Sequence, residues 1–192
     1  MAKRRNKEKA LAALIEQIKS SDPEVRTSAW QGAGRVGAAA VGPLAQVMQA
    51  QDIEVARAAK RAMWKIVHDA GRPGGRTRQL ETELAALLGS RTPVSVRREV
   101  LWMLSEIGGK KAIEPMAELL GHQDLREDAR MALERIPLRQ AVVALKDAFE
   151  KAPEDFKPNL AQSLRKRGAK VKGYPCRKLV PVKQTAVKPL DK

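Results

Sequence analysis

The sequence has few of the residues on which catalytic, redox and cofactor sites most often depend. Its 192 residues include one cysteine, two histidines and six aromatic side chains, namely three Trp, two Phe and one Tyr. The lone Cys176 excludes an internal disulfide and fits a reducing compartment, so the cytoplasm is the expected location. So few aromatic residues also disfavour a platform on which successive bases of a single strand would stack.

Long apolar runs are absent as well. No stretch approaches the roughly 18 to 20 consecutive apolar residues that a membrane-spanning helix needs. The N-terminus is basic, but the segment 10–18 mixes apolar residues with charged and amide groups, unlike a secretory signal. We therefore expect no membrane span.

The few potential ligands and nucleophiles are scattered. His68 and His122 are 54 residues apart, and neither has a second ligand at metal-binding spacing. Asp124 and Asp128 follow His122, where they are better interpreted as caps of the next helix. Cys176 has no neighbouring histidine and is expected to be a spare thiol. The sequence thus predicts no catalytic residue, no metal site and no cofactor, and favours a protein that is not an enzyme.

Positive charge, by contrast, is abundant and concentrated at the two ends. The formal net charge is +15. Residues 1–10 carry five Lys/Arg and one Glu, residues 165–192 carry ten Lys/Arg and one Asp, and only +2 remains for residues 11–164. Basic blocks of this kind bind polyanions, because each neutralised phosphate releases counterions. Nucleic acid or a ribonucleoprotein is therefore an expected partner.

Between these ends the sequence repeats about every thirty residues. Equivalent apolar positions at Val25, Val55, Val96, Leu125 and Phe156 are separated by 30, 41, 29 and 31 residues. Apolar residues recur at helical spacing around each position, and the cap candidates Asp22 and Asp52 precede the first two. This period predicts stacked pairs of helices that pack only on their neighbours. The helices are expected over 7–19, 23–36, 41–50, 53–69, 80–88, 94–107, 113–120, 125–136, 142–149 and 154–167.

The pattern divides the chain into a basic extended N-terminal arm over 1–9, a repeat body over 10–168 and a basic extended segment over 169–192. An inserted Arg/Gly loop at 71–78 accounts for the longest step, and it is either a recognition loop that follows a phosphate backbone or a merely solvated loop. The last unit lacks a second helix, so the helix over 154–167 is expected to leave an apolar face open. The C-terminal segment, a neighbouring protein or a second copy of the chain could cover that face.

The motif Asp22-Pro23-Glu24-Val25-Arg26, followed by Val36-Gly37 and then Ala40-Val41-Gly42-Pro43-Leu44, resembles a known repeat. Trp102 to Gly108 with Ala112-Ile113-Glu114-Pro115-Met116 resembles it again. The likeness is to HEAT repeats of the short, phycobilisome-lyase type and covers roughly residues 20–150. It implies an all-α, right-handed α-solenoid of about five helix pairs. Such repeats serve adaptors, bilin lyases and nucleic-acid proteins alike, so the resemblance leaves the function open.

Three arginines, Arg26, Arg97 and Arg126, recur at one position of the repeat, with Lys157 in the same place. One interpretation is a ladder of phosphate contacts. The interpretation that we favour is that each bonds to an acidic group or a helix end of the adjoining unit.

The three tryptophans, Trp30, Trp64 and Trp102, invite comparison with HEAT-like alkylpurine DNA glycosylases. They do not occupy one repeat position, however, and core or half-buried packing is expected instead.

Three functions follow from these observations. The first is a non-enzymatic scaffold that binds a protein partner through the solenoid and nucleic acid through its basic ends. The others are an enzyme on the same scaffold, either a DNA-repair glycosylase or a bilin lyase, and a structural subunit of a large assembly. The predicted nucleic-acid contacts lie in the ends and the inserted loop: Lys3, Arg4, Arg5, Lys7, Arg72, Arg76, Arg78, Arg165, Lys166, Arg167, Lys170, Lys172, Arg177 and Lys178.

Overall fold

The computed structural model describes residues 2–75 and 77–175, and every regular element in these two ranges is helical. The α-helices are α1 (Ala2–Ile18), α2 (Pro23–Gly32), α3 (Val41–Val47), α4 (Ile53–Ala70), α5 (Thr77–Ala86), α6 (Val94–Ile107), α7 (Lys110–Glu118), α8 (Arg126–Arg135), α9 (Arg139–Lys151) and α10 (Lys157–Lys166). Three short 3-10 helices accompany them: η1 (Ala33–Arg35), η2 (Gly37–Ala40) and η3 (Leu119–Gly121).

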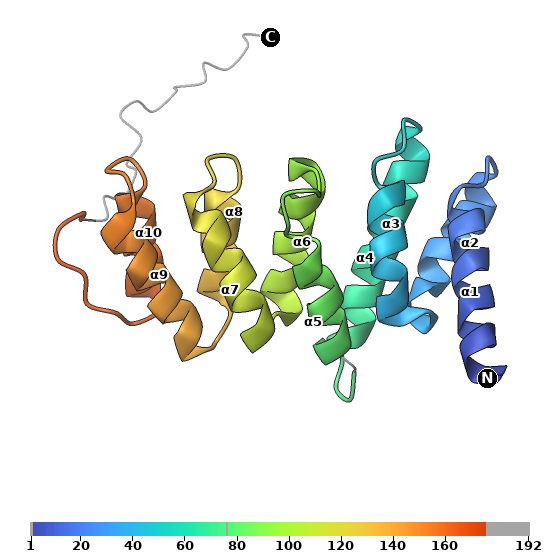
Figure 1. Ribbon diagram of the computed structural model, residues 1–192, viewed down its shortest axis with the longest axis horizontal. Helices are drawn as coiled ribbons and strands as arrows, with labels where there is room; N and C mark the ends of the chain where they lie inside the picture. The colour runs from blue at the N-terminus through green and yellow to red at the C-terminus, as the bar shows by residue number, and fades with distance from the viewer. Residues whose placement is uncertain (1, 76, 176–192) are drawn as a thin grey trace, which may run out of the picture.

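The helices form two rows that run the length of the molecule (Figure 1). In one row α2, α4, α6, α8 and α10 each pack on the next, and in the other row α1, α3, α5, α7 and α9 do the same. Each odd-numbered helix also packs on the even-numbered helix that follows it. The arrangement is that of an α-solenoid, in which contacts are confined to neighbouring units. Handedness and the number of repeat units stay predictions.

One continuous apolar core lies between the rows. Large side chains such as Ile18, Met63, Leu104 and Phe156 are at most 1% exposed. Alanines fill many of the remaining core positions, for example Ala59 and Ala62 of α4 at 0% exposure. Small side chains let neighbouring helices approach closely, so the alanines of the repeat set the spacing within the stack.

The predicted caps of the first units are confirmed. The Asp22 side chain accepts a hydrogen bond from the backbone N–H of Glu24 at 2.8 Å, and Asp52 accepts from Glu54 at 2.8 Å and Val55 at 3.3 Å. Each satisfies N–H groups that a helix start leaves without an intrahelical partner. The prediction for Asp124 and Asp128 was wrong, because α8 has no side-chain cap. There the Nδ1 atom of His122 accepts from the Asp124 N–H at 3.3 Å and closes a turn.

The N-terminal boundary also differs from the prediction. Residues 2–9 form the first turns of α1 rather than an extended arm. Helix α2 ends earlier than expected, at Gly32, and the chain continues in the tighter 3-10 helix η1. The positive φ of Gly37, 72°, then separates η1 from η2. The tightening brings Gly34 against α4, where a Cβ atom on residue 34 would lie 1.9 Å from Oδ2 of Asp69.

The expected open face on the last helix is not present. Phe156, Leu160 and Leu164 are at most 1% exposed, because α10 packs on both α8 and α9. The segment 169–175 then folds back, with Ala169 and Val171 packed against the core. The prediction failed because it counted helix pairs from α2 and left α10 alone, whereas α10 pairs with α9.

Arg165 and Tyr174 hold the returning segment in place. The Arg165 guanidinium donates to the carbonyls of Tyr174 at 2.7 Å and Val171 at 3.1 Å, and also to that of Gly173. The Tyr174 ring meets Phe149 of α9 edge-on at 5.6 Å, and its hydroxyl donates to Glu154 at 2.6 Å. The predicted extended segment therefore begins as an ordered cover on the last helix pair, and its remainder over 176–192 lies outside the described residues.

Candidate functional site

Two tryptophan–carboxylate pairs link neighbouring helices of the even-numbered row. Trp64 of α4 donates through Nε1 to Glu99 of α6 at 3.3 Å, and Lys60 pairs with the same carboxylate at 2.8 Å. One unit along, Trp102 donates to Asp128 of α8 at 3.1 Å, and Arg98 pairs with it at 3.0 Å. Both indoles are half-buried, as predicted. Each carboxylate already has an indole and a cation as partners, so the pairs join helices and offer no free base.

Trp30 has different surroundings. With Trp64, Lys60, Arg61, Lys65 and His68 it lines a cleft of about 200 Å³ between α2 and α4. The Trp64 and His68 rings lie 5.5 Å apart at 43°, and the Arg61 guanidinium lies 6.0 Å from the centre of the Trp30 ring. The Trp30 Nε1 atom is buried without a hydrogen-bond partner among the described residues. This combination of rings and cations is called the tryptophan cleft below.

Two of the four recurring cations, Arg26 and Arg126, bond to a helix end or an acidic group of the adjoining unit, as favoured above. Arg26 donates to the carbonyls of Ser20 and Ser21 at 2.7 and 2.9 Å, beyond the end of α1. Arg126 pairs with Asp155 of the next unit at 2.6 Å and lies 4.8 Å over the Phe156 ring. Arg97 is only 7% exposed, and its Nε atom has no hydrogen-bond partner among the described residues. Lys157 pairs with Glu154 at 2.7 Å, which raises the pKa of the Lys157 ammonium.

Several cations predicted to contact nucleic acid have intramolecular partners, and their contact with nucleic acid stays a prediction. Arg167 donates to the carbonyls of Glu134 at 3.0 Å and Leu138 at 3.3 Å, and also to that of Ile136, so it closes the turn between α8 and α9. Lys166 pairs with Glu134 at 2.6 Å. Together with Arg165, these residues have structural roles that their position in a basic block did not reveal.

The other predicted contacts are placed as follows. Arg5, Lys7, Arg72, Arg78, Lys170 and Lys172 are exposed, and Arg72 lies 3.6 Å from Asp69. Lys3 and Arg4 lie on the first turn of α1. Arg76, Arg177 and Lys178 lie outside the described residues. The exposed residues of this predicted set therefore lie at both ends of the stack and at the turn between α4 and α5.

That turn projects from the lower edge of the stack (Figure 1). Its end and the start of α5 border an open hollow of about 530 Å³, with Arg78 and Lys111 among the lining residues. Lys111 donates to the Thr82 hydroxyl at 3.3 Å. The inserted loop thus contributes to a surface with cations from two helix pairs, and its role in recognition stays a prediction.

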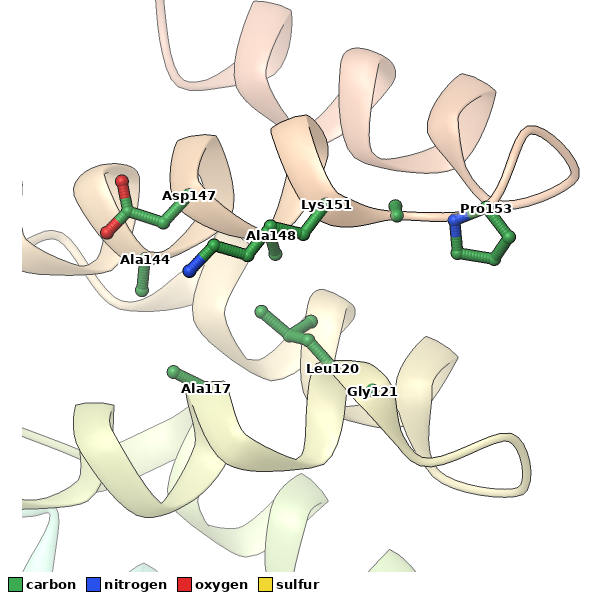
Figure 2. Close-up of a pocket in the computed structure, with 9 residues that line it drawn as sticks. Ala117, Leu120, Gly121, Ala144, Asp147, Ala148, Lys151 and Pro153 are labelled. Carbon is green, nitrogen blue, oxygen red and sulfur yellow. The ribbon is translucent and has the colours of Figure 1, made fainter.

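Figure 2 shows the groove between α7 and α9, which has a volume of about 370 Å³. Leu120 of η3 points toward α9 between Ala117 and Ala148, and the Lys151 side chain runs along the opposite wall. Asp147 and Lys151 are the charged residues in its lining. The groove is an apolar surface made of small side chains, without a nucleophile or paired acids.

The buried Glu81 was not singled out from the sequence. Glu81 belongs to α5 and is 7% exposed. Its side chain reaches the start of α7, where its Oε1 atom accepts hydrogen bonds from the backbone N–H groups of Gly109 at 3.0 Å and Ala112 at 2.9 Å. A carboxylate at a helix N-terminus interacts favourably with the helix dipole. The only sequence signal was a charged residue on the apolar face of its helix, and its two partners are 28 and 31 residues away.

Within the described ranges, no group of three or more His, Cys, Asp and Glu residues could hold a metal ion. None of the helices described is long and apolar enough to cross a membrane. The groups with shifted pKa values belong to ion pairs and hydrogen bonds, some within one helix, as Lys65 with Asp69 in α4, and some between helix pairs, as Arg126 with Asp155. Hydrogen bonds from Lys65 and Arg126, for example, lower the pKa values of Asp69 and Asp155 respectively.

These features define an all-helical repeat protein, a fold that commonly mediates protein interaction. A family model for HEAT repeats matches residues 41–134. The match is to HEAT repeats in general, and the phycobilisome-lyase type remains a resemblance. The chain matches no curated protein.

The solved structures similar to the chain include one engineered protein and one designed repeat protein. An engineered protein shares 21% identity over 82% of this chain and 78% of its own, with a TM-score of 0.44. A designed armadillo repeat protein shares 15% identity over 80% of this chain and 98% of its own, with a TM-score of 0.38.

Proposed function

We propose that the chain is a non-enzymatic interaction protein of the cytoplasm. Its helical stack docks a protein partner, and its basic ends bind nucleic acid or a ribonucleoprotein. The observation that carries the proposal is the distribution of charge: of the net +15, only +2 belongs to residues 11–164. The helical body provides a frame, and the ends provide affinity for a polyanion.

The ion pairs of the body support this division. Lys60, Arg98, Arg126 and Arg135 each pair with a carboxylate on a neighbouring helix pair. These cations join neighbouring helix pairs, and the charge of each is already balanced by its carboxylate partner. Exposed cations such as Arg5, Lys7, Lys170 and Lys172 lie near the ends, where phosphates can reach them.

The structure determines how the proposal should be tested. Deleting residues 1–9 or 169–192 would remove the start of α1 or the cover on α10. A sharper variant ends the chain after Pro175, which removes five Lys/Arg and one Asp, and replaces Arg5, Lys7, Lys170 and Lys172 with Gln. We expect its affinity for a labelled 20-base-pair DNA duplex to fall steeply, and the slope of log K against log [salt] to flatten by about one unit per lost phosphate contact.

The control replaces four exposed cations of the body, Lys19, Lys110, Arg139 and Lys146, with Gln in the full-length chain, and it is matched in charge to a full-length variant that carries only the four Gln substitutions at the ends. Non-specific attraction to a positive protein would weaken alike in these two full-length variants. The proposal predicts a much smaller loss in the control. Unchanged duplex binding by the end variant, with its helical content retained by circular dichroism, would contradict the proposal.

The protein-binding half rests on the fold. Affinity purification from the native cell, with and without nuclease, separates the two halves. Partners that remain after nuclease bind the helical stack, and partners that are lost bind through nucleic acid. If every partner is lost, the chain is a nucleic-acid protein without a docked protein.

A further inference from the structure

We propose that the tryptophan cleft between α2 and α4 binds one base of a single-stranded nucleic acid, with an adjacent phosphate on Arg61. This inference rests on the proposed function, since the basic ends first hold the strand. It adds a nucleic-acid site on the body of the stack, where the proposed function places only the docking of a protein.

The cleft has the size and lining that one flat ring needs. Its volume of about 200 Å³ is smaller than the roughly 300–1,000 Å³ of sites that enclose a whole small molecule. Trp30 comes from α2, while Trp64 and His68 come from successive turns of α4. Every base has a π-face that can stack on such rings, so the site would tolerate different bases.

Arg61 is the cation of the cleft that remains available. Lys60 is paired with Glu99 at 2.8 Å, and Lys65 with Asp69 at 2.7 Å. Arg61 is exposed, has no carboxylate partner in the described part of the chain, and lies at about the limiting distance for a cation–π contact with Trp30. Its guanidinium can therefore donate to a phosphate without giving up an ion pair.

Trp30 also differs from the other two tryptophans in its hydrogen bonding. Trp64 and Trp102 donate to carboxylates, whereas the buried Nε1 atom of Trp30 has no acceptor among the residues described. A buried donor without an acceptor is unusual in a folded protein. A ligand oxygen would supply that acceptor only after the side chains that cover Nε1 have moved aside.

The site would distinguish single strands from duplexes. In a duplex the bases are stacked and paired, so a cleft can take a base only from a single strand or by paying to unstack one. The basic ends do not discriminate in this way, because they contact phosphates alone. The cleft and the ends therefore make separate contributions that can be measured separately.

Fluorescence of a Trp102→Phe variant provides a direct test. The chain has three tryptophans, so the two that remain both line the cleft. The probes are a 15-nucleotide oligo(dT) and an abasic strand of the same length and charge. We expect oligo(dT) to quench the fluorescence at saturation and to bind about 5- to 150-fold more tightly than the abasic strand, the range that stacking of one base provides. The abasic strand is expected to bind through the ends without quenching.

Substitutions localise the effect. Arg61→Gln changes an exposed side chain without a carboxylate partner, so the fold is expected to persist while the preference for oligo(dT) falls. Trp30→Leu is expected to abolish the preference. Trp102→Leu is the matched control, because Trp102 is a half-buried indole of the same row outside the cleft, and the preference should be unchanged.

The outcomes separate this inference from the proposed function. Equal affinity for both strands, without quenching, overturns the cleft as a base site and leaves the basic ends intact. A preference that survives both Arg61→Gln and Trp30→Leu also overturns it. If neither strand binds at low salt, the proposed function fails as well.

Discussion

At the scale of single residues, Gly34 shows how one position sets the approach of two helices. The carboxylate of Asp69 occupies the space beside Gly34 because Lys65 holds it at 2.7 Å and Arg72 lies 3.6 Å away. The hydrogen bond from Lys65 lowers the pKa of Asp69, so the carboxylate stays charged in place. No side chain fits at residue 34 unless Asp69 moves.

We therefore expect Gly34→Ala to lower the free energy of unfolding by about 1–3 kcal/mol, the usual cost of overpacking. Gly32→Ala is the control, because a Cβ atom there has no neighbour within 4 Å, and alanine is the better helix former. Urea denaturation measures both. In the Asp69→Ala background the cost of Gly34→Ala should shrink, since the two residues are in contact. Strictly additive effects would show that the clash is not the cause.

Residue-scale features were predictable where they depend on neighbours in the sequence. The caps Asp22 and Asp52 bond to residues two or three positions away, so the sequence motif was sufficient. Glu99 accepts from Trp64, which is 35 positions away, and that pairing depends on how two helices align across units. A one-dimensional pattern does not contain that alignment.

At the scale of helices, a buried polar cluster joins α8 to α10. The Ser163 hydroxyl, at 0% exposure, donates to Glu134 at 2.6 Å, and Arg130 donates to both residues. Lys166 pairs with the same carboxylate at 2.6 Å. Burial alone would raise the pKa of Glu134, but the hydrogen bonds from Lys166 and Ser163 and the charge of Arg130 outweigh it, so the pKa is held below its ordinary 4.5.

A lowered carboxylate pKa contributes stability that is fully present above the unfolded-state value and is lost as the pH falls through the folded-state value. We expect the wild-type free energy of unfolding to decrease below about pH 4.5. Glu134→Gln should lose about 1–3 kcal/mol at pH 7 and show a smaller further decrease in acid. Glu118→Gln, at an exposed position of α7, is the control. A variant as acid-sensitive as the wild type would exclude Glu134 as a source of the pH dependence.

The last helix shows why helix order alone misled the prediction. Phe156, Leu160 and Leu164 were identified correctly as an apolar face. Their partners come from α9, α8 and the returning segment 169–175, whose lysine- and proline-containing sequence is typical of an unstructured segment. The segment is fixed by carbonyl groups that accept from Arg165, and backbone acceptors have no signature in the sequence.

At the scale of the whole molecule, contacts between neighbours alone imply that stability is local. Each helix packs on the helices next to it in the two rows, so loosening one end should leave the other end unchanged. The thirty-residue period was enough to predict this architecture. The tryptophan cleft was not predictable, because Trp30 and Trp64 occupy different repeat positions and meet only through the packing of α2 on α4.

Hydrogen exchange measured by mass spectrometry tests this locality. Leu160→Ala, at a fully buried site in α10, should cost about 2–5 kcal/mol and speed exchange in α8, α9 and α10 while α2 and α4 stay protected. Met63→Ala in α4 is the mirror-image variant, and faster exchange should then appear in α2 to α6. Uniformly faster exchange in both variants would mean that the stack unfolds as a single cooperative body.

The cover that residues 169–175 place over α10 has a consequence for assembly. A stack of similar units whose last helix were bare would present a surface on which the first helix of another copy could seat, and head-to-tail contacts of this kind propagate into open filaments. With Tyr174 against Phe149 and Arg165 bound to the returning backbone, residues 169–175 occupy that surface of the last helix pair. Any helix added beyond this point must first displace that segment before it can extend the stack.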